Sequence, residues 1–122
     1  MKKINKKNLL ILILTILYLN NLAFSQIKPK ITFIEIGSVT CIPCKKMQPI
    51  MRNIEKKYAE QIKVIFHDIK NEKEIIEKYK VNIIPTQVFL DENGKEIHRH
   101  VGYFPEVEID KFLKKIGLKA KQ

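Results

Sequence analysis

The sequence predicts an α/β domain whose elements follow the order β-α-β-α-β-β-α, with a mixed central sheet flanked by helices. Two observations lead to this prediction. Apolar runs rich in β-branched residues alternate with segments in which apolar residues recur every three or four positions. An Asn93-Gly94 pair, the dipeptide typical of a tight hairpin, divides the last apolar run into two strands. Residues 26–122 are enough for one domain with a single modest core.

The first strand and the first long helix of this domain follow from clear patterns. We predict a strand at Lys30–Gly37, because "KITFIEIG" is apolar almost without a break and suits a strand covered on both faces. We predict an amphipathic helix from about Cys44 to Glu60, in which charged residues separate the apolar ones. The apolar positions of this helix are Met47, Ile50, Met51, Ile54 and Tyr58.

The next two elements repeat the order of strand and helix. Gln61–Ile69 returns to a β pattern. Asn71–Lys80 predicts a short helix, with Asn71 as its cap and acidic residues in its first turn. Together with the strand that follows, these segments predict two βαβ-like crossovers and therefore a sheet that is parallel in part.

A hairpin and a helix complete the domain. Thr86–Gly102 predicts two strands joined at Asn93-Gly94, which adds an antiparallel side to the sheet. The final helix is predicted to have Pro105 at its first position and Gly117 as its C-cap. The apolar face of this helix comprises Ile109, Phe112, Leu113 and Ile116.

Residues 1–25 have the pattern of a targeting segment. Met1–Lys7 carries four lysines and no acidic residue, and Asn8–Leu19 is an apolar stretch that is short for a membrane-spanning helix. Ala23 and Ser25 occupy the −3 and −1 positions of a cleavage site before Gln26. We expect a secretory signal peptide. The alternative is an uncleaved N-terminal membrane anchor, and both interpretations place the domain outside the cytoplasm.

The basic charge of the chain does not indicate a nucleic-acid partner. The net charge falls from +10 to +6 without residues 1–25, because that segment holds four of the 23 basic residues and none of the 13 acidic ones. The remaining lysines alternate with glutamates at helical spacing, and no basic stripe is interleaved with aromatic residues. Solvated helix faces therefore explain the charge.

The two cysteines, Cys41 and Cys44, lie in "GSVTCIPCKKMQPI", directly before the predicted helix. A disulfide between them would close too small a loop to be a structural staple. A zinc site needs four ligands, and the other candidates, His67, His98 and His100, do not have zinc-finger spacing. We therefore expect no metal or other cofactor, and we interpret the histidines as solvated strand residues.

Thiol-disulfide exchange makes use of each feature of this stretch. The unpaired N–H groups and the positive dipole at the start of a helix stabilise the thiolate of Cys41, and Lys45 and Lys46 add positive charge. Cys41 is expected to be the exposed nucleophile, with Cys44 beneath it as the resolving thiol. Cys41 attacks a substrate disulfide, and Cys44 then breaks the mixed disulfide.

The order of strand, CxxC motif and helix resembles the thioredoxin-fold oxidoreductases, over roughly Lys30 to Leu118. Within the motif, Pro43 stands in the family's place before the second cysteine, and Pro49 matches the proline that kinks the family's helix. The segment "NIIPT" resembles the family's Ile-cis-Pro-Thr segment. The resemblance implies a cis bond between Ile84 and Pro85 that faces the cysteines, with the backbone at Ile84 pairing with an extended substrate.

Glu35 falls six residues before Cys41, where thioredoxins carry a buried aspartate. The resemblance implies that Glu35 exchanges protons with Cys44, and burial in a strand should raise its pKa. The alternative interpretation places Glu35 at an exposed strand edge. Thr40 and Ile42 depart from the family, which usually has Trp and Gly there, so the rim around the cysteines is expected to differ in shape. We expect this rim, together with Pro43, to help select the substrate.

The resemblance implies an enzyme, a thiol:disulfide oxidoreductase of exported bacterial type. We expect a protein-disulfide reductase, because Pro43 stands where oxidants of this fold tend to carry His. Its expected partners are client proteins with disulfides and a membrane protein that passes on electrons from cytoplasmic thioredoxin. Cytochrome c biogenesis or disulfide repair in the periplasm is the expected use, and we expect a monomer. The alternatives are an oxidase or isomerase, and a non-catalytic module that binds peptides or acts as a metallochaperone.

Overall fold

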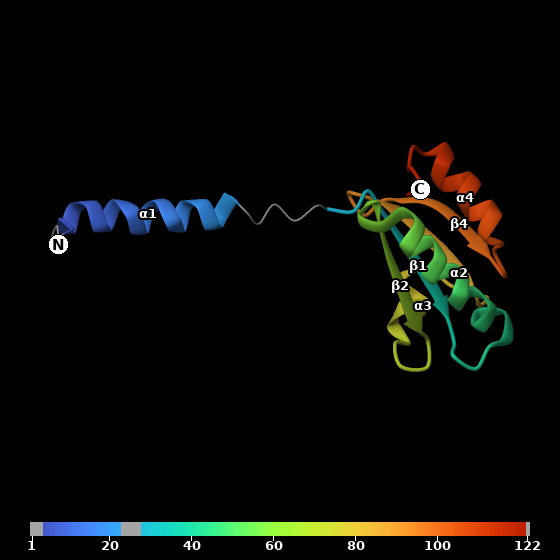
Figure 1. Cartoon of the computed structure of the whole chain (residues 1–122). Helices are drawn as coiled ribbons and strands as arrows, with labels where there is room; N and C mark the ends of the chain where they lie inside the picture. The colour runs from blue at the N-terminus through green and yellow to red at the C-terminus, as the bar shows by residue number, and fades with distance from the viewer. Residues whose placement is uncertain (1–3, 23–27, 122) are drawn as a thin grey trace.

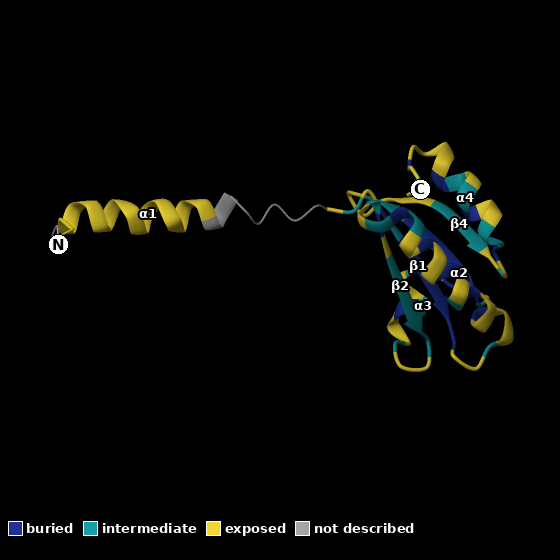
Figure 2. Ribbon diagram, viewed as in Figure 1, coloured by how far each residue is buried: buried dark blue, intermediate teal, exposed yellow. Residues whose placement is uncertain are grey.

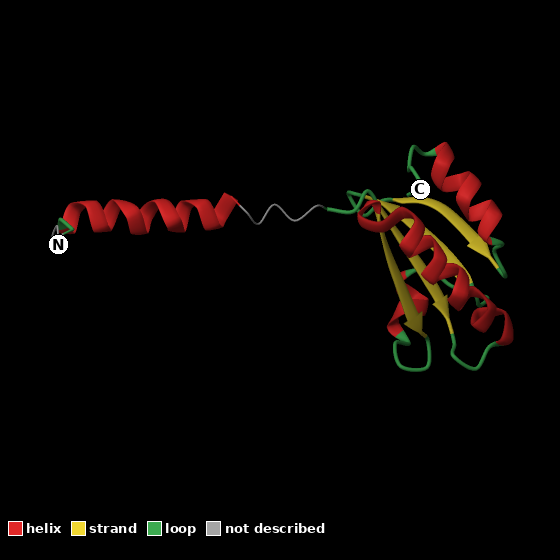
Figure 3. Cartoon of the chain, viewed as in Figure 1, coloured by secondary structure: helices red, strands yellow, loops and turns green. Residues whose placement is uncertain are grey.

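Four strands form one mixed sheet, in the order β2-β1-β3-β4, in the computed structural model of the chain (Figure 1). The structure describes residues 4–22 and 28–121. Helices flank the sheet (Figure 3), and the predicted fold class is confirmed. The elements in chain order are α1 (Lys6–Leu22), β1 (Ile31–Gly37), α2 (Ile42–Tyr58), the 3-10 helix η1 (Ala59–Gln61), β2 (Ile62–Asp68), α3 (Glu74–Lys78), β3 (Thr86–Asp91), β4 (Glu96–Val101) and α4 (Glu106–Lys115).

The strand pairing confirms the mixed sheet but changes one predicted connection. β1 is parallel to β2 and antiparallel to β3, which is antiparallel to β4. Only the connection through α2 is therefore a parallel crossover, and the predicted second crossover is wrong. The cause is the short α3, because five helical residues span about 7.5 Å whereas the seven residues of β2 span about 23 Å. α3 cannot return the chain along the sheet, so β3 starts where β2 stops.

The start of α3 also differs from the prediction. The helix begins at Glu74, after Lys73, and no side chain in the described part of the chain caps it. Asn71 lies in the preceding turn, where its N–H donates to the Asp68 carbonyl at 3.0 Å. The Oδ1 atom of Asp68 accepts the N–H of Lys70 at 3.1 Å. Asp68 therefore shapes this turn by an Asx-type bond, and the predicted cap at Asn71 is wrong.

The long helix α2 keeps its predicted amphipathic face but is shifted along the chain. It begins at Ile42, before the predicted start, because Cys41 forms its N-cap. It ends at Tyr58, where the chain tightens into η1, instead of at Glu60. Pro49 lies inside the helix, as the resemblance implied. The predicted apolar residues of α2 are buried against the sheet.

The last helix, α4, ends as predicted and starts one residue later than predicted. Pro105 is its N-cap and not its first helical residue. Gly117 has a φ of +96°, the left-handed conformation that glycine adopts without strain. The N–H groups of Gly117 and Leu118 donate to the carbonyls of Lys114 and Leu113, which is the Schellman pattern of a helix end.

Alternate residues of β1 fill two apolar clusters on opposite faces of the sheet. Phe33 lies in the cluster that α2 and α4 cover, and its ring stacks on Phe89 of β3 with the centroids 4.7 Å apart. Ile34 and Ile36 lie in the other cluster, with Ile75 of α3. β1 is buried along most of its length (Figure 2), so the prediction of a strand covered on both faces is confirmed.

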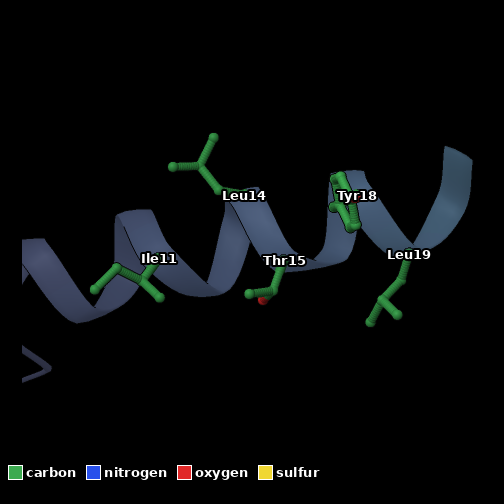
Figure 4. Close-up of a pocket in the computed structure, with 5 residues that line it drawn as sticks. All are labelled: Ile11, Leu14, Thr15, Tyr18 and Leu19. Atoms are coloured by element: carbon green, nitrogen blue, oxygen red, sulfur yellow. The ribbon is translucent and has the colours of Figure 1, made fainter.

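α1 lies within the predicted targeting segment. Every side chain from Ile4 to Leu19 is exposed, and Figure 2 shows the helix in the colour of exposed residues. Among the described residues, those that line a hollow along α1 all belong to this helix, as Figure 4 shows, and these are Ile11, Leu14, Thr15, Tyr18 and Leu19. Because one exposed helix supplies these side chains, the hollow is open.

The N-terminal segment has two alternative interpretations, a cleaved signal peptide and an uncleaved membrane anchor. No helix within residues 4–22 and 28–121 has both the length and the apolar character that a membrane span requires. The residues of the predicted cleavage site, Ala23, Ser25 and Gln26, lie outside the described residues. The targeting segment therefore stays a prediction.

Candidate active site

The two cysteines lie at the junction of β1 and α2, as the sequence predicted. A disulfide joins Cys41 to Cys44, whose Cα atoms are 5.2 Å apart. Cys41 is the N-cap of α2, in an extended backbone conformation, and Cys44 lies in the first turn of the helix. The chain thus brings both sulfur atoms to one end of the sheet, where β1 stops.

The two sulfur atoms differ in their access to solvent. Cys44 is 1% exposed, whereas Cys41 is half-buried. The N–H of Cys44 donates to the Sγ atom of Cys41 at 3.3 Å. In the reduced protein, this N–H and the helix dipole would stabilise a thiolate on Cys41. The geometry therefore favours Cys41 as the attacking sulfur and Cys44 as the protected one.

Gly37, the last residue of β1, provides the space in which Cys44 packs. A Cβ atom at Gly37 would lie 3.0 Å from the Sγ atom of Cys44 and 3.2 Å from its Cβ atom. Both distances are tighter than nine in ten contacts of real Cβ atoms, so a larger residue at position 37 would require Cys44 to move by a few tenths of an ångström. The sequence analysis used Gly37 only as a strand end, although a glycine closing a buried strand is a signal of close approach.

A short turn holds Cys41 in place. Ser38 is buried, and its Oγ atom lies 3.1 Å from the Oγ1 atom of Thr40 and accepts the N–H of Thr40 at 3.3 Å. The Ser38 carbonyl accepts the N–H of Cys41 at 3.1 Å. Thr40 is exposed, as a residue that contacts substrate must be. The sequence analysis missed Ser38, although a serine directly after a strand is typical of such turns.

Glu35 is fully buried, at 0% exposure, in the central strand β1. The alternative interpretation, an exposed strand edge, is therefore wrong. Glu35 and Gly37 point to the same face of β1, because side chains alternate along a strand, and their Cα atoms are roughly 7 Å apart. Glu35 thus lies on the face of the sheet that contacts Cys44. Burial raises the pKa of its carboxyl to about 8, and a hydrogen bond from Gln87 opposes part of that rise.

Gln87 is the partner of Glu35 that the sequence analysis missed. It is fully buried on β3 and pairs in register with Glu35. Its Nε2 atom donates to the Oε2 atom of Glu35 at 2.9 Å and to the Gly102 carbonyl at 3.0 Å. A polar residue in the apolar run "TQVFL" is the available signal, but its partner depends on a strand register that no local pattern gives.

The peptide bond between Ile84 and Pro85 is cis, as the resemblance implied. Thr86 pairs with Ile36, so continuing the same register places Pro85 opposite Gly37, at the end of the sheet that holds the cysteines. The Pro85 carbonyl accepts the N–H of Gly102 at 2.7 Å. The structure therefore brings this loop to the same edge as the CxxC motif.

The surface around the cysteines, at this end of the sheet, carries exposed aliphatic side chains. Ile42 is 69% exposed on the first turn of α2, beside the exposed Pro43. The sequence analysis missed two further ones, Val39 in the turn before Cys41 and Ile83 in the loop before the cis bond. Ile84, by contrast, packs partly against the apolar cluster on the α3 side. Ile42 thus gives the rim the aliphatic character that its departure from the family predicted.

The three histidines lie on strands β2 and β4, as predicted, but they are half-buried instead of fully solvated. The Nδ1 atom of His67 lies 2.6 Å from the Oε2 atom of Glu72. His98 and His100 share a face of β4 and stack on Phe112 and Phe104, with ring centroids 4.4 and 4.0 Å apart. Among the described residues, no group of three or more metal-ligating side chains is placed to hold an ion.

Comparison with known proteins agrees with this geometry. A family model described as a thioredoxin-like domain matches residues 22–117. Thioredoxin-1 of Drosophila melanogaster is 33% identical over 66 residues, which are 54% of this chain and 62% of that protein. A prophage-derived thioredoxin-like protein of Bacillus subtilis is 29% identical over 85 residues, which are 68% of this chain and 95% of that protein. The chain therefore spans less than two thirds of the fly thioredoxin.

Solved structures give the same relationship. The germline-specific thioredoxin Deadhead of Drosophila melanogaster superposes with a TM-score of 0.66 at 25% identity. The superposition covers 81% of this chain and 90% of that chain. The family model spans most of the chain, and its match includes the strand, the CxxC motif and the cis-proline loop. The chain belongs to the thioredoxin-like family.

Proposed function

We propose that the chain is an exported thiol:disulfide oxidoreductase that reduces protein disulfides with the dithiol of Cys41 and Cys44. The observation that carries this proposal is the difference in solvent exposure between Cys41 and Cys44. Cys41 is half-buried at the start of α2, and Cys44 is 1% exposed beneath it. A client sulfur can therefore reach Cys41, whereas Cys44 is placed to attack only the Sγ atom of Cys41, once a client sulfur is bonded to that atom.

The proposed reaction transfers two electrons in two exchanges. The Cys41 thiolate attacks one sulfur of the client disulfide, and the other client sulfur leaves as a thiolate that takes up a proton. The Cys44 thiol loses its proton to the Glu35 carboxylate, and the resulting thiolate attacks the Sγ atom of Cys41. The bond between Cys41 and the client breaks, the second client sulfur leaves as a thiolate that takes up a proton, and the enzyme holds the Cys41–Cys44 disulfide.

The reductive direction is proposed from Pro43. A histidine at this position would stabilise the Cys41 thiolate further and make the pair a stronger oxidant. Pro43 has no charge and no donor to offer a thiolate. The experiment is to equilibrate the protein with glutathione buffers and measure the fraction of Cys41–Cys44 disulfide. A reductase requires a potential below that of the glutathione couple, and a potential near those of strong oxidants would support the oxidase alternative.

Export and the electron source are part of the proposal. The basic and apolar segment before residue 25 supports export, and the exported domain would need a membrane protein that supplies electrons from cytoplasmic thioredoxin. Client proteins with disulfides, including those of cytochrome c biogenesis, are the proposed substrates in the periplasm. Mass measurement of the exported protein tests the first step. A start at Gln26 supports a cleaved signal peptide, and retention of Met1 supports an anchor.

Activity itself is tested by turnover of insulin disulfides with dithiothreitol as the electron source. The wild-type protein is expected to accelerate precipitation of the insulin B chain, and Cys41→Ser is expected to abolish the acceleration. Pro49→Ala, a change on an exposed residue of the same helix, serves as the matched control and is expected to stay active. Equal activity of Cys41→Ser and wild type would refute the assignment of the nucleophile, and inactive wild type would favour a non-catalytic binding module.

A further inference from the structure

We propose that Gln87 is a positioning residue that orients Glu35 for proton exchange with Cys44 and links it to the cis-proline loop. The inference rests on the proposed function, in which Glu35 takes the proton of Cys44. It adds a residue that the CxxC motif and its neighbours in sequence do not include. Gln87 lies 43 positions after Cys44 in the chain and reaches Glu35 only because β3 pairs with β1.

The first step of the argument is that the Gln87 amide has one orientation. Both of its Nε2 hydrogens have acceptors, the Oε2 atom of Glu35 at 2.9 Å and the Gly102 carbonyl at 3.0 Å. A carbonyl can only accept, so the opposite orientation of the amide would place two oxygens against each other at Gly102. Glu35 and Gln87 are both 0% exposed, so water does not compete for the bond between them.

The second step is that this orientation assigns the proton of Glu35 to one oxygen. The Oε2 atom accepts from Gln87, so a neutral carboxyl carries its hydrogen on Oε1. Among the described residues, the Oε1 atom of Glu35 has no hydrogen-bond partner, and neither has the Oε1 atom of Gln87. The free Oε1 of Glu35 is therefore the atom that can give a proton to Cys44 or take one from it.

The third step is the connection to the loop that holds the cis bond. The N–H of Gly102 donates to the Pro85 carbonyl at 2.7 Å, and the carbonyl of Gly102 accepts from Gln87. Gln87 thereby joins Glu35 to the loop that, in the proposed function, lies beside the client. A displacement of this loop would change the hydrogen bond that holds the carboxyl.

The hydrogen bond from Gln87 affects the pKa of Glu35, and a measurement of that pKa therefore tests the proposal. A hydrogen bond donated by an amide favours the charged carboxylate, so Gln87 lowers the pKa of Glu35 while burial raises it. Other titratable groups on the surrounding elements are Asp68 at the end of β2, His100, which is the register partner of Gln87 on β4, and, in the reduced protein, Cys44 on α2. Carbon-13 NMR separates a glutamate carboxyl from the imidazole of His100 and from a thiol.

The test is a pH titration of Glu35 in the full chain, in which NMR monitors the side-chain carboxyl. Gln87→Met keeps the length of the side chain and removes the donor, and it is expected to raise the Glu35 pKa by about one pH unit, the size that one hydrogen bond to a charged group supports. Gln87→Leu serves as a second variant if the first does not fold. An unchanged Glu35 titration in a folded variant would overturn the proposal.

A kinetic measurement separates positioning from a purely structural role. The pH profile of insulin reduction by Gln87→Met is expected to shift to higher pH by the same amount as the titration. In the Glu35→Gln background, Gln87→Met is expected to leave the profile in place, because no carboxyl remains to be tuned. A shifted titration with an unshifted profile would overturn the proposed role in turnover.

The outcomes also separate this proposal from the proposed function. Inactive wild-type protein whose Glu35 titration still depends on Gln87 would refute the reductase function and leave the contact intact. If the wild-type protein is active but the Glu35 titration is the same with and without Gln87, only the proposed role of Gln87 would be refuted.

Discussion

Replacing Glu35 with glutamine should stabilise the fold at neutral pH, even though the change removes a proposed catalytic group. Glu35 is 0% exposed, and burial raises its pKa from the ordinary 4.5 to about 8. Glutamine keeps an oxygen that accepts the Nε2 hydrogen of Gln87, but it does not ionise. The substitution therefore removes a titration and little else.

The magnitude follows from linkage between folding and protonation. Below pH 4.5 both states of the protein hold the proton of Glu35, so it adds no pH dependence. Between pH 4.5 and 8 the unfolded chain releases the proton while the folded chain keeps it, so the free energy of unfolding falls as the pH rises. A shift from 4.5 to about 8, at 1.36 kcal/mol per pKa unit, makes the whole fall about 5 kcal/mol.

The assay is urea unfolding of the oxidised wild type and of Glu35→Gln at a series of pH values from 4 to 9. The difference in unfolding free energy between the two proteins cancels the contribution of every other group. It is expected to be constant below pH 4.5, to grow in favour of the variant by about 1.4 kcal/mol per pH unit, and to level off above pH 8.

The matched control is Glu55→Gln, a change at an exposed glutamate of α2. Its difference from wild type should stay small across the same pH range, because the Glu55 side chain is exposed and folding removes little of it from water. A difference for Glu35→Gln that does not depend on pH would refute the reasoning. It would mean that burial does not raise the pKa of Glu35 and that its carboxyl is already ionised in the folded protein at neutral pH.

Two further predictions concern packing around the site and the attachment of α4. Gly37→Ala places a Cβ atom 3.0 Å from the Sγ atom of Cys44, and it should destabilise the oxidised protein by about 1–3 kcal/mol in urea unfolding. Unchanged stability would show that Cys44 does not pack on β1 as described. Asp110→Ala removes the acceptor of the buried Tyr58 hydroxyl, 3.0 Å away, and should lower stability by about 1–3 kcal/mol, because that hydroxyl loses its partner.

The control for Asp110→Ala is Glu108→Ala on the same helix. Glu108 is exposed and pairs with Lys111, whose side chain is 69% exposed, so this pair should contribute less than about 1 kcal/mol. Equal losses in the two variants would contradict the view that the bond from Tyr58 to Asp110 ties α2 to α4.

The features that the sequence predicted correctly depend on patterns within a short stretch of chain. The apolar run at Lys30–Gly37 predicted a strand that is covered on both faces, and Gly117 predicted the end of a helix. The position of Cys41 and Cys44 before an amphipathic run was enough to place both at the N-terminus of α2. In each case the physical cause lies within a few residues, so one sequence carries the signal.

The features that the sequence did not predict depend on contacts between distant segments. Gln87 meets Glu35 only through the register of β3 on β1, and Gly37 meets Cys44 only after α2 has folded back on the strand. The direction of β3 depended on the length of α3, because a helix of five residues cannot return the chain along the sheet. The histidines illustrate the same point, since His100 is covered by Phe104, a residue from the loop before α4.

Trapping of the mixed disulfide is the most direct test of the central claim, that Cys41 attacks client disulfides and Cys44 resolves them. Reduced Cys44→Ser protein, mixed with insulin, is expected to accumulate a covalent adduct at Cys41 that dithiothreitol releases and that mass spectrometry locates. Cys41→Ser is expected to give no adduct, because Cys44 is 1% exposed. Adducts at Cys44 in the Cys41→Ser protein, or no adduct in either variant, would contradict the claim.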